Sequence, residues 1–254
     1  MLVVISPSKT LDFSKHFENK SHTIPVFLKE SEELVKRLRM FSKEDLMKLL
    51  KISEPIAEEN FKRFVNWDLC HPAEKSRIAI LAFKGEAYEN LKASTFTTSD
   101  FEFVSRHLRI LSGLYGLLRP LDYVMPYRLE MGTKFENSSG KDLYKYWRSK
   151  VTYEINKLVN ENHFKTIINL ASSEYFKVIN EKQIEVPIIN ITFKQDVDGE
   201  FKTMGVYSKR ARGIMANFIV KNRITQPEEL IQFIADGYQY SSQLSSEKDW
   251  VYTR

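Results

Sequence analysis

The side chains in this chain with the clearest chemical potential are polar residues that directly follow predicted strands. Leu2–Ile5 is a short apolar run typical of a strand, and Lys9 follows it after a Ser-Pro-Ser cluster. Lys84 and Ser172 also come just after apolar runs. Ligands of α/β sheets gather at the carboxyl ends of strands, so these positions are candidates for an anion-binding or nucleotide site. An ordinary solvated lysine is the simpler interpretation of Lys9 on residue type alone.

A second group of cations opens a predicted helix. Ser208 is typical of an N-cap residue. The next turn would then contain Lys209, Arg210 and Arg212, where the helix dipole disfavours positive charge. The stretch 202–223 carries six basic residues and no acidic one. An anion bound at the helix start would explain the arrangement, because free amides, dipole and side chains would hold it together. A solvated basic face is the alternative.

The stretch 109–134, RILSGLYGLLRPLDYVMPYRLEMGTK, is apolar and yet broken by glycine and proline. This combination predicts a buried, ordered loop whose charges are paired or face a cleft. Those charges are Arg119, Asp122, Arg128, Glu130 and Lys134. Two interpretations of these charges stay open: they form internal ion pairs in a structural loop, or some of them line a site.

Residues 42–66 predict two short helices joined by a tight connection. Ser42 and Asp45 form a capping-box pattern at the start of the first helix. Two helices so joined are typical of a helix–hairpin–helix element, in which backbone amides and lysines such as Lys48 and Lys51 hold phosphate. This hairpin lacks the usual Gly-x-Gly, so a plain helical hairpin is an equal alternative.

Composition excludes several protein classes. The chain has 254 residues, 43% of them hydrophobic and 13% aromatic, which is ample for a sizeable core. No apolar run approaches the roughly 18 residues of a membrane helix, and the N-terminus lacks a signal-peptide pattern. The single cysteine, Cys70, excludes an internal disulfide and fits the cytoplasm. The histidines show no metal-ligand spacing, so we expect no metal and no cofactor. A net charge of +5 and a pI of about 9.0 modestly favour polyanionic partners.

The remaining patterns predict a mixed α/β fold in one compact domain, 1–254, with a mixed β-sheet flanked by helices and the helix–hairpin–helix-like element. Predicted helices cover 25–40, 99–107, 141–159 and 227–235. Predicted strands cover 77–83, 108–111, 166–170, 186–193 and 201–207, with edge strands at 238–240 and 250–252.

Five segments together resemble the bacterial peroxide-stress protein YaaA family, also called DUF328 or UPF0246. They are ISPSKTLD (5–12), LAFKGEAY (81–88), LSGLYGLLRPLDYVMPYRLEMG (111–132), NLASSEYF (169–176) and SKRARGIMANFI (208–219). The resemblance implies a cytoplasmic α/β protein with a helix–hairpin–helix element and a positively charged, DNA-binding cleft. It also implies a role in peroxide stress, by limiting free iron and so limiting oxidative DNA damage. Carried over by motif position, the cleft residues are Lys9, Lys84, Arg119, Arg128, Lys209, Arg210 and Arg212, with Lys48 and Lys51 in the hairpin.

Two functions from different classes follow as hypotheses. The first is a non-enzymatic protein, with a monomer favoured, that binds the backbone of double-stranded DNA with little sequence specificity. The second is an enzyme acting on a nucleotide or nucleic acid, with Glu130 as acid/base and the cations as phosphate clamps. Its pocket would include Asp12, Tyr127, Glu130, Ser172 and Glu174.

Overall fold

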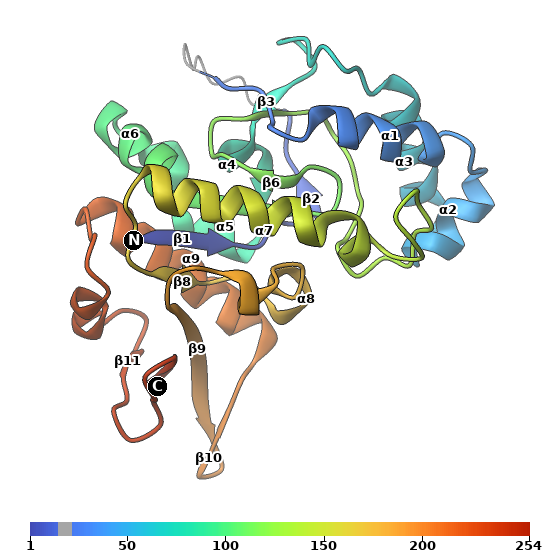
Figure 1. The fold of residues 1–254 in the computed structure, drawn as a ribbon. Helices are drawn as coiled ribbons and strands as arrows, with labels where there is room; N and C mark the ends of the chain where they lie inside the picture. The colour runs from blue at the N-terminus through green and yellow to red at the C-terminus, as the bar shows by residue number, and fades with distance from the viewer. Residues whose placement is uncertain (15–21) are drawn as a thin grey trace.

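The chain is organised around one twisted, mostly parallel sheet in the computed structural model, which describes residues 1–14 and 22–254 (Figure 1). The strands lie in the order β11-β12-β9-β8-β1-β5-β6, and β10 pairs with β9. β12, β9, β8, β1 and β5 run parallel to one another. The antiparallel pairs are β6 with β5, β10 with β9 and β11 with β12. The bounds are β1 Leu2–Ile5, β5 Leu108–Ser112, β6 Gly116–Leu118, β8 Ile167–Asn169, β9 Ile188–Val197, β10 Glu200–Lys202, β11 Gln239–Tyr240 and β12 Asp249–Thr253. The predicted mixed α/β fold is confirmed.

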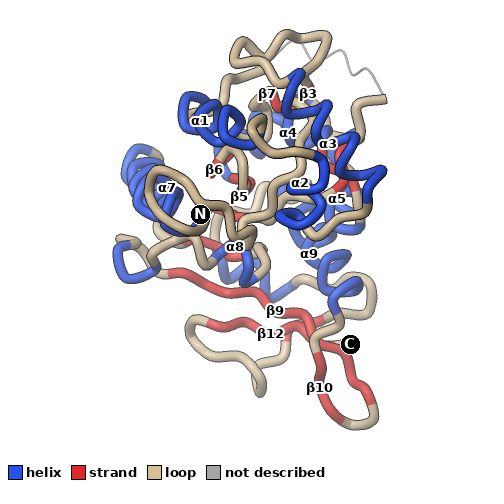
Figure 2. Tube along the Cα trace, turned by 90° about the vertical axis from the view of Figure 1, so that its right-hand side faces the viewer, coloured by secondary structure: helices blue, strands red, loops and turns tan. Residues whose placement is uncertain are grey.

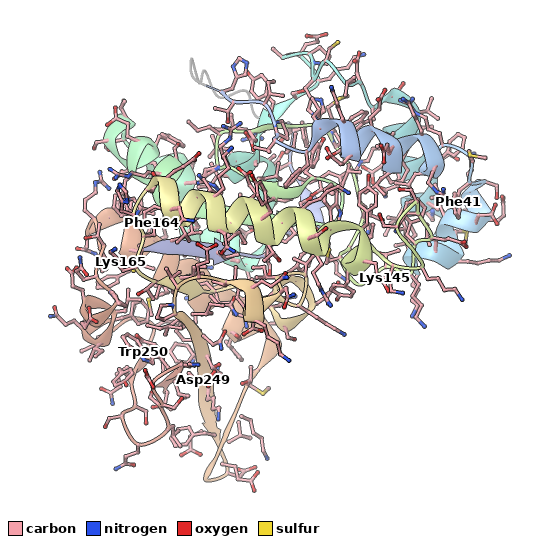
Figure 3. All side chains as sticks on the ribbon, viewed as in Figure 1. Phe41, Lys145, Phe164, Lys165, Asp249 and Trp250 are labelled. Atoms are coloured by element: carbon pink, nitrogen blue, oxygen red, sulfur yellow. The ribbon has the colours of Figure 1, made fainter. Side chains whose placement is uncertain are left out.

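Helices cover both faces of the central strands. α7 (Leu143–Glu161) lies on one face, and α5 (Glu86–Leu91) and α9 (Gly205–Lys221) lie on the other (Figure 2). Every residue of β1, β5 and β8 is buried, as expected for parallel strands covered on both sides. Side chains fill the space between these layers (Figure 3).

The remaining elements surround this core. The other helices are α1 Leu28–Leu38, α2 Lys43–Leu50, α3 Glu54–Asn66, α4 Ala79–Ala82, α6 Thr98–His107, α8 Ser173–Phe176 and the 3₁₀ turns Ala93–Thr95, Glu181–Gln183 and Pro227–Gln232. Two small antiparallel ladders join β2 (Thr10–Leu11) to β4 (Phe83–Lys84) and β3 (Arg77–Ile78) to β7 (Tyr123–Val124).

The predicted helical pair is present as α2 and α3. The capping box at Ser42 and Asp45 is confirmed, with both hydrogen bonds formed. Lys51 ends α2 in the left-handed conformation, with φ 53°, and so occupies the kind of turn position at which glycine is usual. A helical hairpin is therefore formed without the glycine pattern. Its grip on nucleic acid stays a prediction.

The stretch 109–134 is buried and ordered, as predicted. Trp147 Nε1 donates a hydrogen bond to Gly113 O at 2.9 Å, and this ties the stretch to α7. A Cβ at Gly113 would lie 2.2 Å from Leu129 O, so the close approach of these two backbone segments requires glycine. The predicted internal ion pairs are also present, between Arg119 and Asp122 and between Arg128 and Glu130.

Several predicted elements are wrong in extent or kind. The run 77–83 is not one strand, because the turn α4 separates two-residue strands. α6 begins at Thr98, one residue before the predicted start, after a capping box formed by Thr97 and Asp100. Of the predicted helix 227–235, only Pro227–Gln232 is helical, and it is a short 3₁₀ turn. β12 is no edge strand, since it lies between β9 and β11; Asp249 and Trp250 at its start mark its place beside β9 in Figure 3.

The predicted start of α9, with Ser208 as the N-cap, is wrong. The helix begins at Gly205, and the Ser208 N–H donates to Met204 O at 2.8 Å, so Ser208 is not the N-cap. The predicted strand 201–207 is accordingly only β10, and its last residues are helical. Lys209, Arg210 and Arg212 therefore lie beyond the first turn, and the argument from the helix dipole no longer applies to them.

Candidate functional site

β1 and β8 form a topological switch point, where the connections of two neighbouring parallel strands leave in opposite directions. The chain leaves β1 toward β5 on one side, whereas it leaves β8 toward β9 on the other. Ligands of open α/β sheets bind outside the carboxyl ends of strands at such a point. Here those ends continue as Ser6–Lys9 and Leu170–Ser172.

A cavity of about 320 Å³ lies at this position, and we call it the switch-point cavity. Its walls come from the loops after β1 and β8, from α5 and from one face of α9. Its lining includes Ile5, Ser6, Lys9, Glu86, Tyr88, Leu91, Leu170, Ser172, Glu174, Tyr175, Val206, Lys209, Arg212, Gly213 and Ala216. Lys9 and Ser172, predicted from strand ends, thus line the same cavity, and Lys209 and Arg212 reach it from α9.

Two helices close the cavity where they pack most tightly. Ala87 of α5 contacts Gly213 of α9, and a Cβ on Gly213 would lie 2.0 Å from Ala87 O. Residues Val206, Lys209, Gly213 and Ala216 recur on one face of α9 at three- and four-residue spacing. Glycine at this crossing therefore sets how close the basic face of α9 comes to the strand ends.

Hydroxyl groups line the strand-end side of the cavity. Ser6 Oγ accepts a hydrogen bond from the Ser172 N–H at 2.8 Å and donates to Ser172 Oγ at 3.3 Å. Tyr88 OH donates to Ser6 O at 2.9 Å. Burial raises the pKa of Tyr88 well above its usual value, so its phenol stays a neutral donor. These bonds fix the two loops to each other.

Arg212 is the most unusual residue of the cavity. Burial lowers the pKa of its guanidinium, which nevertheless stays protonated at neutral pH. Within residues 1–14 and 22–254 it has no hydrogen bond and no carboxylate partner, and its Nε is fully shielded from solvent. Arg212 as a whole is half-buried, and a charge partly withdrawn from water is normally paired, so an anion bound here would complete its surroundings.

Glu130 joins the central stretch to the loop after β1. Its Oε1 lies 3.1 Å from Lys9 Nζ and 3.0 Å from Arg128 Nη2. Glu130 and Arg128 are not among the residues that line the switch-point cavity. The predicted acid/base is thus held in an ion-pair cluster at the rim, next to Lys9.

Asp12 and Lys84 lie together on the β2–β4 ladder. Lys84 Nζ is 3.8 Å from Asp12 Oδ2, and both the amide and the hydroxyl of Ser14 donate to Asp12 Oδ1. The hydrogen bonds from Ser14 are the main reason that the pKa of Asp12 is lowered. Asp12 is therefore a carboxylate acceptor at neutral pH, and Lys84 is half-exposed beside it.

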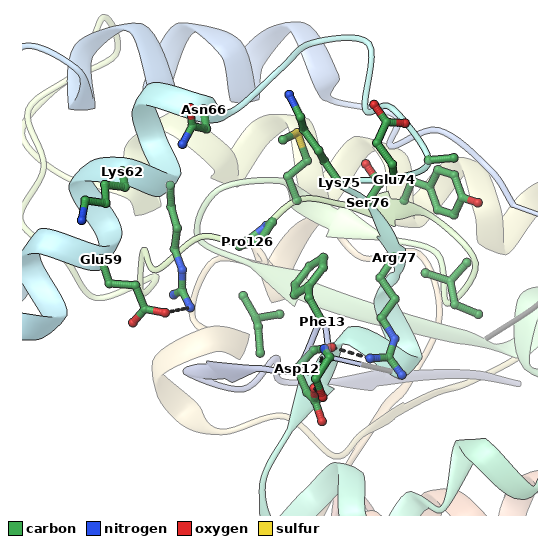
Figure 4. Close-up of a pocket in the computed structure, with 17 residues that line it drawn as sticks. Asp12, Phe13, Glu59, Lys62, Asn66, Glu74, Lys75, Ser76, Arg77 and Pro126 are labelled. Atoms are coloured by element: carbon green, nitrogen blue, oxygen red, sulfur yellow. Dashed lines mark hydrogen bonds and ion pairs between the residues drawn. The ribbon is translucent and has the colours of Figure 1, made fainter. Parts of the chain in front are cut away.

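A larger cavity of about 850 Å³ lies between α3 and β3, and Asp12 belongs to its lining (Figure 4). Its charged residues include Lys62, Arg63, Lys75 and Arg77 together with Asp12, Glu59 and Glu74. Arg63 Nη2 pairs with Glu59 at 2.6 Å, and Arg77 Nη1 donates to Asp12 O at 2.5 Å. With four cations against three carboxylates, this cavity has little excess of either sign.

The other predicted site residues lie elsewhere. Arg119 Nε pairs with the fully buried Asp122 at 3.0 Å, and Arg210 Nε lies 3.4 Å from Asp236. Tyr127 is buried, with its OH 2.7 Å from Ser112 Oγ, and does not line the switch-point cavity.

The last three predicted residues divide between the cavity and the hairpin. Glu174 lines the switch-point cavity, and its Oε1 accepts a hydrogen bond from the Gly132 N–H at 3.1 Å. Lys48 and Lys51 are exposed on the hairpin.

Sequence reasoning missed Ser6, Tyr88 and Gly213. Ser6 had a usable signal, since it follows β1 directly. Tyr88 and Gly213 had none beyond their presence in the family-like segments, because their roles depend on how α5 and α9 meet.

Two general features bear on the class of site. Across the described part of the chain, no three histidine, cysteine, aspartate or glutamate side chains are grouped so that they could hold a metal ion. None of the helices in that part has the length and apolar character needed to cross a membrane.

Known proteins similar to this chain define its family. A family model described as "Peroxide stress protein YaaA" matches residues 1–244. A UPF0246 protein of Teredinibacter turnerae is 45% identical over 254 residues, which is all of this chain and 99% of that protein. UPF0246 proteins of Saccharophagus degradans and Ralstonia pickettii are 44% and 42% identical, again over the whole chain and 99% of each relative. Because the match spans the chain and includes every segment that forms the switch-point cavity, this chain belongs to the peroxide stress protein YaaA family, whose members also bear the name UPF0246.

Proposed function

We propose that the protein binds DNA through the phosphate backbone and thereby protects it from iron-dependent oxidative damage during peroxide stress. The observation that carries the proposal is Arg212, a half-buried arginine beside a cavity, whose Nε is shielded from solvent and which has no anionic partner in residues 1–14 and 22–254. Guanidinium binds phosphate through parallel, charge-assisted hydrogen bonds, and such a ligand would compensate the burial of the charge.

Exposed lysines around the cavity support a polyanionic partner rather than a single small anion. Lys9, Lys84 and Lys209 come from three separate segments of the chain, and the side chains of Lys9 and Lys84 are more than half exposed. Each can contact one phosphate of a strand that passes the cavity. The ion pairs of Lys9 and Lys84 are partly exposed, so solvent screens them and a phosphate can replace the carboxylate.

The α2–α3 hairpin offers a second contact region. Lys48 and Lys51 are exposed there, and Lys51 holds the turn between the helices. Contacts of this kind bind the backbone and its shape, which predicts little dependence on base sequence.

A salt titration of binding to a fluorescent duplex tests this function. We expect log K to fall linearly with log salt, as for counterion release. Lys9→Ala, Lys84→Ala and Lys209→Ala combined should flatten the slope by about one unit for each lost phosphate contact. Binding that ignores salt, or that requires one base sequence, would contradict the proposal.

An enzyme acting on a nucleotide is the second candidate, and the cavity at the switch point favours it. Glu130 is held between Lys9 and Arg128 at the rim, so a carboxylate that acts inside the cavity would be Glu174 or Glu86. Incubation with nucleoside mono-, di- and triphosphates followed by chromatography tests it. Unchanged nucleotides after long incubation would remove this candidate.

A further inference from the structure

We propose that the switch-point cavity is a seat for one mononucleotide unit, with base, sugar and phosphate. The unit is either a free nucleotide or an unpaired nucleotide of the bound strand. In the second case the inference rests on the proposed DNA binding and names the part of DNA that enters the protein. The cavity has the size of such a unit, a lining of cations together with apolar and aromatic side chains, and unused polar groups.

The volume of the cavity selects the size of the ligand. Small-molecule sites span roughly 300–1,000 Å³, so a cavity of about 320 Å³ takes one compact molecule. A double helix cannot enter it. A phosphate group alone would contact Arg212 and leave most of the apolar wall without a partner, so the ligand should carry a second, flat and largely apolar part.

The lining of the cavity combines the kinds of group that bind the parts of a nucleotide. The lining includes three cations, Arg212 and Lys209 on α9 and Lys9 in the loop after β1. It also includes Leu91, Leu170 and the buried tyrosines Tyr88 and Tyr175. Nucleic-acid bases bind against aromatic and apolar surfaces while cations hold the phosphates.

Two polar groups in the lining are available to a ligand. Ser172 Oγ accepts from Ser6 Oγ, so its own hydrogen is donated to no group in the described ranges. The Glu86 carboxylate also has no hydrogen bond or ion pair with residues 1–14 and 22–254. A hydroxyl donor and a carboxylate acceptor on the two sides of one cavity can bind the edge of a base or a sugar hydroxyl.

The surface next to the cavity mouth suits unstacked bases. Val206 lines the cavity and is 60% exposed, and Phe201, Met204 and Tyr207, which are close to it in the sequence, are each more than 40% exposed. Lys202 and Lys209 flank these apolar side chains in the sequence. Apolar and aromatic side chains interleaved with lysines are typical of surfaces that bind single strands. A strand with an unpaired nucleotide can therefore lie across β10 and the start of α9 while that nucleotide enters the cavity.

Calorimetric titration with each of the four 2′-deoxynucleoside 5′-monophosphates, and with inorganic phosphate as reference, tests the seat directly. We expect at least one nucleotide to bind about tenfold or more tightly than phosphate, because only the nucleotide contacts both the cations and the apolar side chains of the lining. Arg212→Met should weaken that binding about tenfold or more. Arg210→Met is the matched control and should leave it unchanged, since Arg210 pairs with Asp236 outside the cavity.

A second pair of variants guards against misfolding of the Arg212 variant. Val206 is exposed, so Val206→Glu and Val206→Gln should both fold. The glutamate at the mouth should repel the phosphate and weaken nucleotide binding, whereas the glutamine should not. Equal affinity of both variants for the nucleotide would contradict the seat.

A DNA comparison identifies the source of the nucleotide. A duplex with one unpaired nucleotide is compared with the fully paired duplex of the same sequence by fluorescence anisotropy. A preference for the unpaired form that Val206→Glu abolishes would assign the seat to the bound strand. Nucleotide binding without that preference would support the seat for a free nucleotide.

Two further outcomes separate this inference from the proposed function. If the duplex binds but neither a nucleotide nor an unpaired base does, the seat is wrong and DNA binding stands. If a nucleotide binds and no DNA does, DNA binding is wrong and the seat stands.

Discussion

Arg210 and Arg212 lie two positions apart on α9 and have opposite surroundings. Arg210 Nε lies 3.4 Å from an oxygen of Asp236, which also accepts a hydrogen bond from Arg254 at 2.8 Å. Arg212 is directed to the switch-point cavity, and its Nε is buried without a hydrogen-bond partner in the described ranges. The same residue type is thus neutralised at one position and left for a ligand at the other. Arg210→Met is therefore a matched control for Arg212→Met.

The first prediction concerns the stability of the two arginine variants. Arg212→Met removes a half-buried charge that has no partner in the described ranges, so the free energy of unfolding should stay the same or rise by about 1 kcal/mol. Arg210→Met removes a half-exposed ion pair and should lower that free energy by less than about 1 kcal/mol. Urea denaturation of both variants measures this. A loss of several kcal/mol in Arg212→Met would mean that Arg212 stabilises the fold and is not reserved for a ligand.

The second prediction concerns the glycines of α9. Alanine normally stabilises a helix relative to glycine by about 1 kcal/mol. Gly205→Ala should follow this rule, because a Cβ there meets no atom within 4 Å. Gly213→Ala should instead destabilise the protein by about 1–3 kcal/mol, since its Cβ would lie 2.0 Å from Ala87 O. Thermal melting of the two variants gives the signs, and equal shifts would contradict the tight crossing of α5 and α9.

The third prediction assigns Arg119 a structural role. Asp122 is fully buried and accepts hydrogen bonds from Arg119 N at 2.7 Å, Arg119 Nε at 3.0 Å and Thr23 Oγ1 at 2.6 Å. Asp122→Ala should lower the free energy of unfolding by about 3 kcal/mol, because the donors lose a buried acceptor. Arg119→Ala should lower it too, by leaving the carboxylate without its cation. A fully stable Arg119→Ala that binds DNA weakly would return Arg119 to the DNA-binding residues.

The fourth prediction concerns pH. His71 is buried, with Nε2 2.9 Å from the Tyr115 hydroxyl, and burial is the main reason that its pKa is lowered. Histidine in the unfolded chain titrates near 6.5, so below about pH 6.5 the unfolded state binds more protons. Stability contributed by His71 is therefore complete above this pH and is lost as pH falls toward its lower folded pKa. His107 acts in the same direction for the same reason.

His71→Asn isolates this contribution. Asparagine tolerates the left-handed backbone that His71 adopts, with φ 46°, and it does not titrate. Urea denaturation at several pH values between about 7.5 and 5.5 should show a smaller pH dependence in this variant than in the wild type. An unchanged pH dependence would mean that His71 is not a buried neutral imidazole.

The sequence predicted those parts of the fold that depend on local patterns. Apolar runs that end in polar clusters located β1 and β8, and through them Lys9 and Ser172. The capping box at Ser42 located α2 because its hydrogen bonds are local. The start of α9 was not predictable in this way, since no side chain caps it and Ser208 is buried within the helix.

The fate of each cation could not be predicted, because it depends on contacts between distant segments. Asp236 lies far beyond the end of α9 in the sequence, and no local pattern around Arg210 indicates that the two residues pair. The separation of Arg212 from every carboxylate in residues 1–14 and 22–254 likewise emerges only when α5, α9 and the ends of β1 and β8 meet. Sequence patterns identified which residues are cations, and the packing determined which of them stay available.

In the proposed function Arg212 holds a phosphate of the bound nucleic acid. The most direct test measures the affinity of Arg212→Met and Arg210→Met for a duplex in parallel, at one low salt concentration. The melting curve of each variant confirms its folded fraction. We expect Arg212→Met to weaken binding by about tenfold or more, as for loss of a charge-assisted contact. We expect Arg210→Met to bind within about a factor of two of the wild type. Equal affinities of the two variants for the duplex would contradict this role of Arg212.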